Sequence, residues 1–230
     1  MTNPIYEPKG AAYEYADYAI NIYTECPHGC WYCYARKMAE RFGGEWTGNV
    51  KPREGILEAL EKQLSKGKLK NERVHLCFGC DPYPRGHDTS ITREIIKLIK
   101  NSGNNVQILT KNIERAERDF DLLDSNDWIG ITLTGEETHS PIDKYFLEMA
   151  YNRNICTFIS FEPILDHKKI MEYLPYIKDY VNKIAFGKLT GCKEAKSYDW
   201  KKIGRELADK AFELNILFYI KESLKKEMQK

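Results

Sequence analysis

The chain has 230 residues, a formal net charge of +1, and 42% hydrophobic against 30% charged residues. This balance excludes a disordered chain and gives no general electrostatic attraction for nucleic acid or an acidic membrane. Seven cysteines are an odd number for a secreted disulfide scaffold, and no apolar run reaches the length of a transmembrane helix. The first residues show no signal-peptide pattern, so we expect a protein of the reducing cytoplasm.

Short apolar runs alternate with amphipathic stretches along the chain. Strands are predicted over residues 19–23, 74–78, 106–109, 128–133, 155–161, 183–186 and 216–220. Helices are predicted over residues 34–41, 52–64, 89–99, 115–123, 142–151, 167–180 and 200–214. This alternation indicates βα units and a mostly parallel sheet, in a chain shorter than the about 250 residues of a complete eight-fold barrel. We therefore expect a partial (β/α)6-type TIM barrel, with residues 216–220 as a candidate extra strand.

The expected domain organisation has three parts. An N-terminal segment over residues 1–17 precedes a barrel domain over residues 18–222, and a charged tail over residues 223–230 follows it. Chemistry in such barrels lies at the C-terminal ends of the strands. Residues that follow each predicted strand are therefore the candidate site residues.

Three cysteines directly follow the first predicted strand. Cys26, Cys30 and Cys33 are separated by three and then two residues. Thiolates at this spacing select zinc, copper(I) or an iron–sulfur cluster. A [4Fe–4S] cluster normally has four protein sulfurs, so three in one loop indicate a centre with an open position. A zinc site is the alternative, with His28 or the pair Cys77 and Cys80 completing the ligand set.

The cysteine loop and three later segments carry a family resemblance. The run CPHGCWYCYAR at residues 26–36 resembles the signature of the radical S-adenosylmethionine superfamily, and more narrowly its spore photoproduct lyase-like branch. Segments GCDPYP at 79–84, LTK at 109–111 and RDFDLL at 118–123 resemble motifs of that branch in the same order. The segment FEPI at 161–164 resembles a related group of phage and bacterial proteins.

The resemblance implies an enzyme with a specific chemistry. Cys26, Cys30 and Cys33 would hold three irons of a [4Fe–4S] cluster, and S-adenosylmethionine would chelate the fourth. A reductant such as ferredoxin or flavodoxin would supply the electron that cleaves S-adenosylmethionine to a 5′-deoxyadenosyl radical. That radical would abstract hydrogen from a substrate, in a lyase or another radical-mediated reaction. Nucleotide, nucleic acid, peptide and small metabolite all stay open as substrates.

Several residues near the first two strand ends are candidates for cofactor contact. Tyr32 and Tyr34 flank Cys33, and the resemblance implies that they lie near the adenosine, with ordinary packing as the alternative. Gly79 and Asp81 follow the second strand, where the resemblance implies contact with the S-adenosylmethionine amino group; turn chemistry is the alternative. Cys80 is a candidate hydrogen donor or relay, and a structural thiol otherwise.

Later strand ends supply further candidates. Lys111 ends the third strand and suits the methionine carboxylate, unless it is exposed or paired with a glutamate. Thr132 and Thr134 end the fourth strand and suit the ribose or the amino-acid part, unless they reflect β-propensity alone. Glu162 ends the fifth strand and either contacts cofactor or substrate or forms a salt bridge with Lys188.

A second functional class stays open on sequence grounds. The chain would then be a non-catalytic zinc or iron–sulfur protein that binds nucleic acid or a protein partner. Tyrosines cluster early in the chain, and aromatic side chains can stack on bases. The same tyrosines can instead pack over the open side of the barrel. These early residues are Tyr13, Tyr15, Tyr18 and Tyr23.

Overall fold

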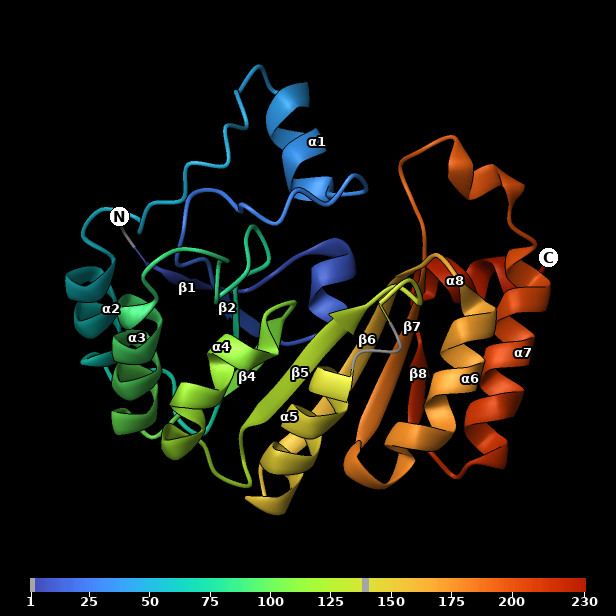
Figure 1. Cartoon of the computed structure of the whole chain (residues 1–230). Helices are drawn as coiled ribbons and strands as arrows, with labels where there is room; N and C mark the ends of the chain where they lie inside the picture. The colour runs from blue at the N-terminus through green and yellow to red at the C-terminus, as the bar shows by residue number, and fades with distance from the viewer. Residues whose placement is uncertain (1–2, 138–140) are drawn as a thin grey trace. The chain divides into compact units, whose positions relative to one another are not determined.

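A computed structural model describes residues 3–137 and 141–230. The chain divides into two compact units, Met1–Trp128 and Ile129–Lys230. Strands and helices alternate in both, as the hydrophobic periodicity predicted. The two units are coloured blue to green and yellow to red in Figure 1.

The first unit is built on parallel strands with one antiparallel edge. Its strands are β1 (Ile5–Tyr6), β2 (Tyr18–Ile20), β3 (Arg73–Leu76) and β4 (Asn105–Thr110). Strand β1 pairs antiparallel with β2, and β2, β3 and β4 are parallel neighbours. Its helices are α1 (Tyr34–Arg41), α2 (Ile56–Leu64), α3 (Ser90–Asn101) and α4 (Ile113–Ala116), with 3₁₀ helices η1 (Gly10–Glu14) and η2 (Glu117–Leu122).

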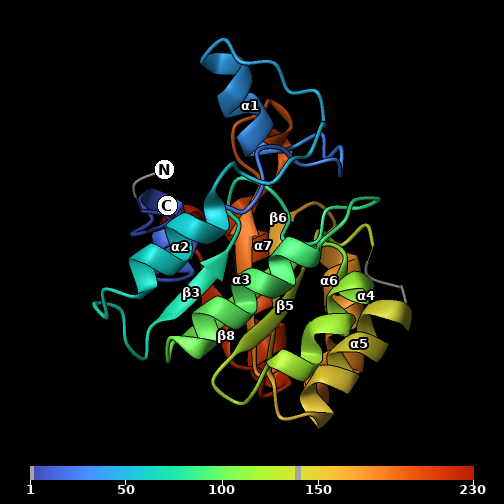
Figure 2. The same cartoon turned by 90° about the vertical axis from the view of Figure 1, so that its left-hand side faces the viewer.

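Helix α3 shows how the sequence builds the core of this unit. Ile95, Ile96 and Ile99 recur at helical spacing and are fully buried, as are Val74 on β3 and Val106 on β4. Each such side chain contributes about 1.5–3 kcal/mol by leaving water. Helices α2 and α3 lie side by side along β3 (Figure 2).

The second unit repeats the βα pattern. Its strands are β5 (Trp128–Leu133), β6 (Cys156–Ile164), β7 (Lys183–Lys188) and β8 (Phe218–Ile220), and β6, β7 and β8 are parallel neighbours. Its helices are α5 (Pro141–Asn152), α6 (His167–Ile177), α7 (Trp200–Glu213) and α8 (Glu222–Met228), with 3₁₀ helices η3 (Lys178–Tyr180) and η4 (Glu194–Ser197). Helices α6 and α7 lie side by side (Figure 1).

The predicted strands and helices are present with ends that differ by a few residues, except that the helix predicted over residues 115–123 consists of the end of α4 followed by the 3₁₀ helix η2. Helix α2 begins at Ile56 rather than at residue 52, because Gly55 adopts the left-handed conformation before it, with φ of +64°. Strand β1 and helices η1 and η4 were not predicted, since they are too short to show a periodicity. Among the described residues, no helix is long and apolar enough to cross a membrane.

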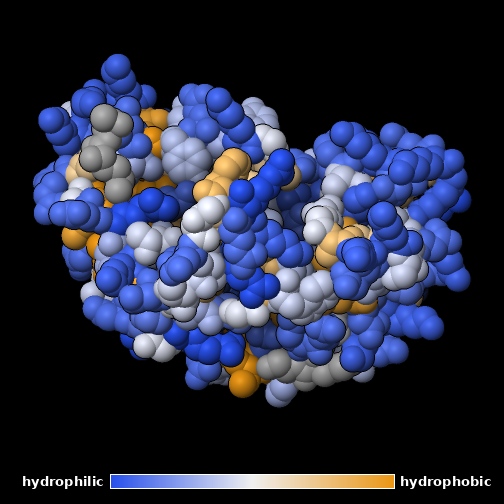
Figure 3. Space-filling model, turned by 90° about the horizontal axis from the view of Figure 1, so that it is seen from above, coloured by the Kyte–Doolittle hydropathy of each residue, from blue (hydrophilic) through white to orange (hydrophobic). Residues whose placement is uncertain are grey.

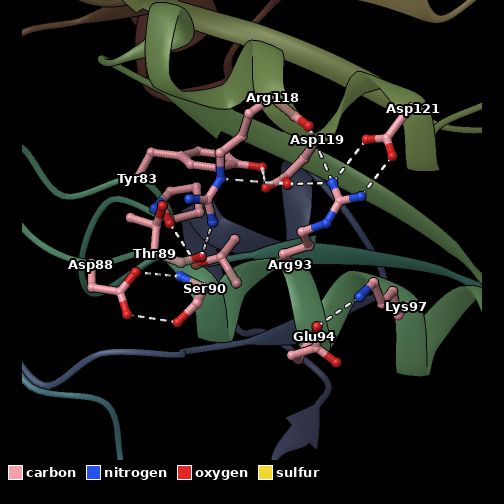
Figure 4. A network of polar contacts seen from close by, with 12 residues as sticks. Tyr83, Asp88, Thr89, Ser90, Arg93, Glu94, Lys97, Arg118, Asp119 and Asp121 are labelled. Carbon is pink, nitrogen blue, oxygen red and sulfur yellow. Dashed lines mark hydrogen bonds and ion pairs between the residues drawn. The ribbon is translucent and has the colours of Figure 1, made fainter.

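A buried polar network ties η2 to α3 and to the loop after β3 (Figure 4). The carboxylate of Asp119 is fully buried and accepts hydrogen bonds from the Arg93 guanidinium at 2.8 Å and from the Tyr83 hydroxyl at 3.0 Å. Arg93 also holds Asp121 through two hydrogen bonds of 2.8 and 2.6 Å. Arg118 donates to the Thr89 carbonyl at 2.6 Å. The segment RDFDLL is therefore a structural clamp on the DPY segment.

Asp119→Ala should destabilise the protein strongly, because it leaves the Tyr83 hydroxyl and one Arg93 contact without their acceptor. We expect a loss of about 3–5 kcal/mol in the free energy of unfolding, measured by urea denaturation. The matched control is Lys97→Ala, which breaks the exposed Lys97–Glu94 pair of the same helix and should cost less than about 0.5 kcal/mol. Equal losses for the two variants would contradict this account of the clamp.

Candidate functional site

The cysteine loop runs from the end of β2 to the start of α1. Cys33 is the N-cap of α1, where its sulfur accepts a hydrogen bond from the Arg36 N–H at 3.5 Å. The Cys33 N–H donates to the Cys30 carbonyl at 3.1 Å. Gly29 has a φ of +66°, a left-handed conformation that lets the chain turn between Cys26 and Cys30. The three cysteines are thus held within one tight, partly exposed loop.

Glu25 anchors the beginning of this loop. Its carboxylate accepts hydrogen bonds from the Thr47 N–H at 2.9 Å, the Thr47 hydroxyl at 3.1 Å and the Gly48 N–H at 2.6 Å. The residues after α1 are therefore tied back to the residue before Cys26. This bracing limits how far the cysteine loop can move without breaking three hydrogen bonds to a carboxylate.

The sulfur of Cys26 lies in a partly buried environment. Burial raises the pKa of the Cys26 thiol to about 12, while the backbone N–H groups of His28 and Asp81 donate to its sulfur and oppose the rise. Such N–H···S contacts tune iron–sulfur centres. Across residues 3–137 and 141–230, no three His, Cys, Asp or Glu side chains converge as a metal-binding group. Metal binding by Cys26, Cys30 and Cys33 therefore stays a prediction.

Asp81 joins the ends of β3 and β4. Its Oδ1 atom accepts hydrogen bonds from the Thr110 hydroxyl at 2.6 Å and the Tyr83 N–H at 2.8 Å, and its Oδ2 atom accepts the Lys111 N–H at 2.8 Å. The side chain is buried. These bonds account for the DPY and LTK segments together: the carboxylate of the first organises the backbone of the second. The predicted contact of Asp81 with a cofactor amino group is a separate matter that stays a prediction.

Lys111 directly follows β4 and places a buried positive charge at that strand end. Its Nζ atom is buried without a hydrogen-bond partner and lies 5.4 Å from the centre of the Tyr32 ring. An ammonium removed from water without hydrogen bonds is costly, so this arrangement suits an incoming anion. The alternatives of an exposed lysine or a lysine paired with a glutamate are wrong for this structure.

His28 lies in the same neighbourhood and was read from the sequence only as a possible zinc ligand. Its Nε2 atom is buried without a hydrogen-bond partner and lies 3.8 Å from Asp81 Oδ2. Burial lowers the pKa of His28, although Asp81 opposes the shift. The imidazole thus connects the cysteine loop to the β3 end. Sequence spacing gave no signal for this contact, since it depends on the fold of the loop.

Tyr34 and Gly79 belong to the same assembly. The Tyr34 hydroxyl donates a short hydrogen bond to the Phe78 carbonyl. The Asn21 side-chain oxygen accepts the N–H groups of Phe78 at 2.9 Å and Gly79 at 2.8 Å. Asn21 directly follows β2, so the ends of β2 and β3 are joined here. The first unit thus links the cysteine loop with Tyr32, Tyr34, Gly79, Asp81 and Lys111 through the contacts given above.

Cys80 is held by its neighbours rather than presented to solvent. A hydrogen bond with the Cys77 thiol, together with burial, raises the pKa of Cys80 well above its usual range. The Cys77 sulfur in turn accepts the Ile22 N–H at 3.4 Å, and Cys77 itself has a left-handed φ of +67°. This geometry is that of two structural thiols bracing the β3 end, and the donor role of Cys80 stays a prediction.

The second unit carries the remaining candidates. Thr132 lies within β5 and Thr134 directly follows it. The Thr134 hydroxyl and N–H both donate to the Glu137 carboxylate, at 2.5 and 2.8 Å, and its carbonyl accepts the Leu165 N–H at 2.8 Å. Thr134 therefore closes the turn after β5 and ties it to the end of β6. Its predicted cofactor contact, like that of Thr132, stays a prediction.

Glu162 has a different ionic partner from the one the sequence suggested. Its carboxylate pairs with Lys221 at 2.7 Å, whereas Lys188 pairs with Glu227 at 2.5 Å. The alternative of a Glu162–Lys188 salt bridge is therefore wrong. Gly187 explains the position of Glu162, because a Cβ atom at Gly187 would come within 2.8 Å of the glutamate side chain.

Two of the four early tyrosines, Tyr15 and Tyr23, pack against other residues of the first unit. The ring of Tyr15 lies 5.7 Å from that of His75 and 6.0 Å from that of Phe78, measured between ring centres. Tyr23 is buried, and its hydroxyl shares a hydrogen bond of 2.9 Å with Thr92. Packing is thus the role of Tyr15 and Tyr23, whereas Tyr13 is exposed.

Asp81→Ala should loosen the first unit, since three donors lose one charged acceptor. We expect the free energy of unfolding to fall by about 3 kcal/mol in chemical denaturation. The matched control is Asp88→Ala, whose exposed carboxylate accepts hydrogen bonds from Ser90 and whose loss should cost much less. A loss for Asp81→Ala no larger than that of the control would show that Asp81 does not join the strand ends.

Comparison with solved structures identifies the fold. The chain superimposes on a spore photoproduct lyase mutant with bound AdoMet and dinucleoside spore photoproduct with a TM-score of 0.70, over 93% of this chain and 78% of that one, at 12% identity. It superimposes on Streptococcus suis SuiB bound to S-adenosylmethionine with a TM-score of 0.62, over 88% and 49% of the two chains, at 9% identity. These likenesses confirm the predicted partial-barrel fold class.

Curated relatives share part of the chain. An uncharacterized protein of Methanocaldococcus jannaschii is 29% identical over 174 residues, which are 69% of this chain and 64% of that protein. An uncharacterized protein of Mycobacterium tuberculosis is 30% identical over 109 residues, which are 45% of this chain and 32% of that protein. The chain thus spans less than two thirds of the length of both relatives.

A family model matches most of the chain in sequence. It is described as "Protein of unknown function (DUF5131)" and matches residues 11–227. The match includes the cysteine loop and every strand end considered above. The chain therefore belongs to the DUF5131 family.

Proposed function

We propose that this chain is a radical S-adenosylmethionine enzyme with its catalytic domain over residues 18–222. Cys26, Cys30 and Cys33 would hold a [4Fe–4S] cluster, and S-adenosylmethionine would occupy the open position beside it. The observation that carries the proposal is the contact chain from the cysteine loop through Asp81 to the buried ammonium of Lys111. The three cysteine thiols and the buried ammonium of Lys111, which lacks a hydrogen-bond acceptor, therefore lie in the first unit.

The donor set fits an iron–sulfur cluster with a vacant ligand position. Three soft sulfurs come from one loop, and the loop is braced by Glu25 and by the N-cap of α1. The N–H groups that donate to the Cys26 sulfur would persist when the thiol becomes a thiolate, and they stabilise that charge.

Lys111 fits the carboxylate of a bound amino acid. The Asp81 carboxylate holds the Lys111 backbone, and the face of Tyr32 holds its ammonium. A carboxylate would supply the missing hydrogen-bond acceptor in a site of low dielectric, where a charge-assisted bond is strong. On this view Asp81 and Tyr32 position Lys111, and Lys111 binds the cofactor.

When bound, the cluster and S-adenosylmethionine supply a 5′-deoxyadenosyl radical that abstracts hydrogen from a substrate. The protein's own residues orient the cofactor and keep water away from it. On the same fold-level resemblance we propose further contacts with the cofactor, made by Gly79, Tyr34, Thr132, Thr134 and Glu162. We also propose a small electron-carrier protein as reductant and the cytoplasm as the location, and the substrate class stays open.

Anaerobic reconstitution with iron and sulfide should give a brown protein with about four iron atoms per chain. Cys26→Ala, Cys30→Ala and Cys33→Ala should each lose most of that iron, since the remaining sulfurs are too few to hold the cluster. Cys156→Ala and Cys192→Ala are matched controls outside the loop and should retain it. Iron content and visible absorption provide the measurement, and a colourless protein with one tightly bound zinc would refute the proposal.

Lys111→Met should weaken S-adenosylmethionine binding about tenfold to hundredfold, the equivalent of one charge-assisted hydrogen bond. Methionine keeps the length and apolar stem of the side chain but removes its charge. Calorimetric titration of the reconstituted protein measures the affinity, and Lys97→Met, at an exposed lysine of α3, is the control. An unchanged affinity for Lys111→Met would exclude the proposed carboxylate contact.

A further inference from the structure

Helix α1 exposes large apolar side chains although it is short and polar overall. None of its residues is buried. The exposed fractions are 59% for Tyr34, 51% for Met38 and 76% for Phe42 at its C-cap, and 44% for Trp31 just before it. In both views α1 stands clear of α2 and α3 (Figures 1 and 2). The apolar side chains of α1 therefore do not serve to pack this helix against the core.

These four side chains form one stripe. Tyr34, Met38 and Phe42 recur every four residues, which places them within an arc of about 80° at 100° per residue, and Trp31 lies in the turn before the helix. Lys37 and Arg41 project from positions along one edge of the stripe. Arg36 projects from the other side, where it donates to the Trp31 carbonyl at 3.1 Å. We call Trp31, Tyr34, Lys37, Met38, Arg41 and Phe42 the α1 stripe.

The stripe combines exposed apolar side chains with two basic residues at one edge. Figure 3 views the molecule from above Figure 1, and this face is mostly hydrophilic with a few apolar areas. Scattered apolar residues need no explanation, but contiguous ones rimmed by charge mark interaction sites. An apolar centre with a basic edge fits a protein partner whose own surface is acidic.

We propose that the α1 stripe is the docking surface for a small acidic electron-carrier protein. This proposal rests on the proposed function, because the electron has to reach the cysteine loop. Cys33 is the N-cap of α1, and a helix of eight residues is about 12 Å long, so the whole stripe lies close to a cluster ligand. A carrier seated there would stand beside the site that it reduces.

The electron balance at this surface is simple. The reduced carrier gives up one electron and is thereby oxidised, and the cluster site accepts that electron and is reduced. No bond forms or breaks at the stripe, and no proton moves there. The role of the stripe is therefore contact and orientation, which predicts an effect on carrier affinity and not on the chemistry that follows.

A nucleic acid is less suited to the stripe than a protein carrier. Binding along a phosphate backbone requires a path of several cations. The stripe has Lys37 and Arg41 on one edge only, Glu40 lies on the same helix, and the chain has a net charge of +1. Met38 and Phe42 add apolar area rather than charge. Nucleic-acid binding is accordingly an outcome that the experiment can reveal.

The test uses the reconstituted full chain, a flavodoxin as the carrier, and dithionite as a reductant that needs no docking surface. The double variants are Met38→Ser with Phe42→Ser, and Lys37→Glu with Arg41→Glu. The matched controls are Phe212→Ser, whose side chain on α7 is 79% exposed, and Lys202→Glu with Arg205→Glu on the same helix. Circular dichroism verifies that every variant folds.

Both stripe variants should bind flavodoxin at least tenfold more weakly in calorimetric titration, and their flavodoxin-driven formation of 5′-deoxyadenosine should fall by a similar factor. Their dithionite-driven rate should equal that of the wild type, and the controls should match the wild type throughout.

Unchanged flavodoxin affinity, or an equal loss in the controls, would overturn the docking proposal and leave the proposed function intact. Loss of binding to a single-stranded oligonucleotide with flavodoxin affinity intact would overturn it in favour of nucleic acid. A wild type that cleaves no cofactor even with dithionite refutes the proposed function, while the affinities still decide the docking surface.

Discussion

The carboxylate of Asp81 is the contact on which the candidate site depends. It accepts three hydrogen bonds that join the ends of β3 and β4, and it lies near the imidazole of His28 in the cysteine loop. The adjoining Tyr83 hydroxyl reaches the buried Asp119, which Arg93 holds in turn. Segments about 30 residues apart in the chain are thereby fixed into one assembly. The motifs DPY, LTK and RDFDLL therefore have a structural role, because their side chains and backbones are bonded into one assembly.

This assembly leaves one charge unsatisfied. Lys111 has its backbone tied to Asp81, its ammonium over Tyr32, and no hydrogen-bond partner at Nζ. A folded protein tolerates such a cost where the surrounding structure enforces it, and sites of this kind are commonly functional. The buried network around Asp119 supplies that enforcement. Fold stability and readiness for an anionic ligand therefore depend on the same set of hydrogen bonds.

The sequence predicted the elements well because hydrophobic periodicity is local, as in α3 with Ile95, Ile96 and Ile99. It predicted the cysteine loop and the strand-end positions for the same reason. Ionic partners depend on tertiary geometry, so Glu162 was given Lys188 as an alternative although the fold brings Lys221 to it. The short strand β1 has no periodicity to detect. The contact between His28 and Asp81 joins two loops and leaves no pattern in either.

The central claim is that the cysteine loop and Lys111 form the two ends of one cofactor site. The most direct measurement is a crystal structure of the anaerobically reconstituted protein with S-adenosylmethionine. The account predicts a [4Fe–4S] cluster bound by Cys26, Cys30 and Cys33, with the methionine carboxylate within hydrogen-bond distance of Lys111 Nζ. A zinc ion on these cysteines, or a cofactor bound away from Lys111, would contradict it.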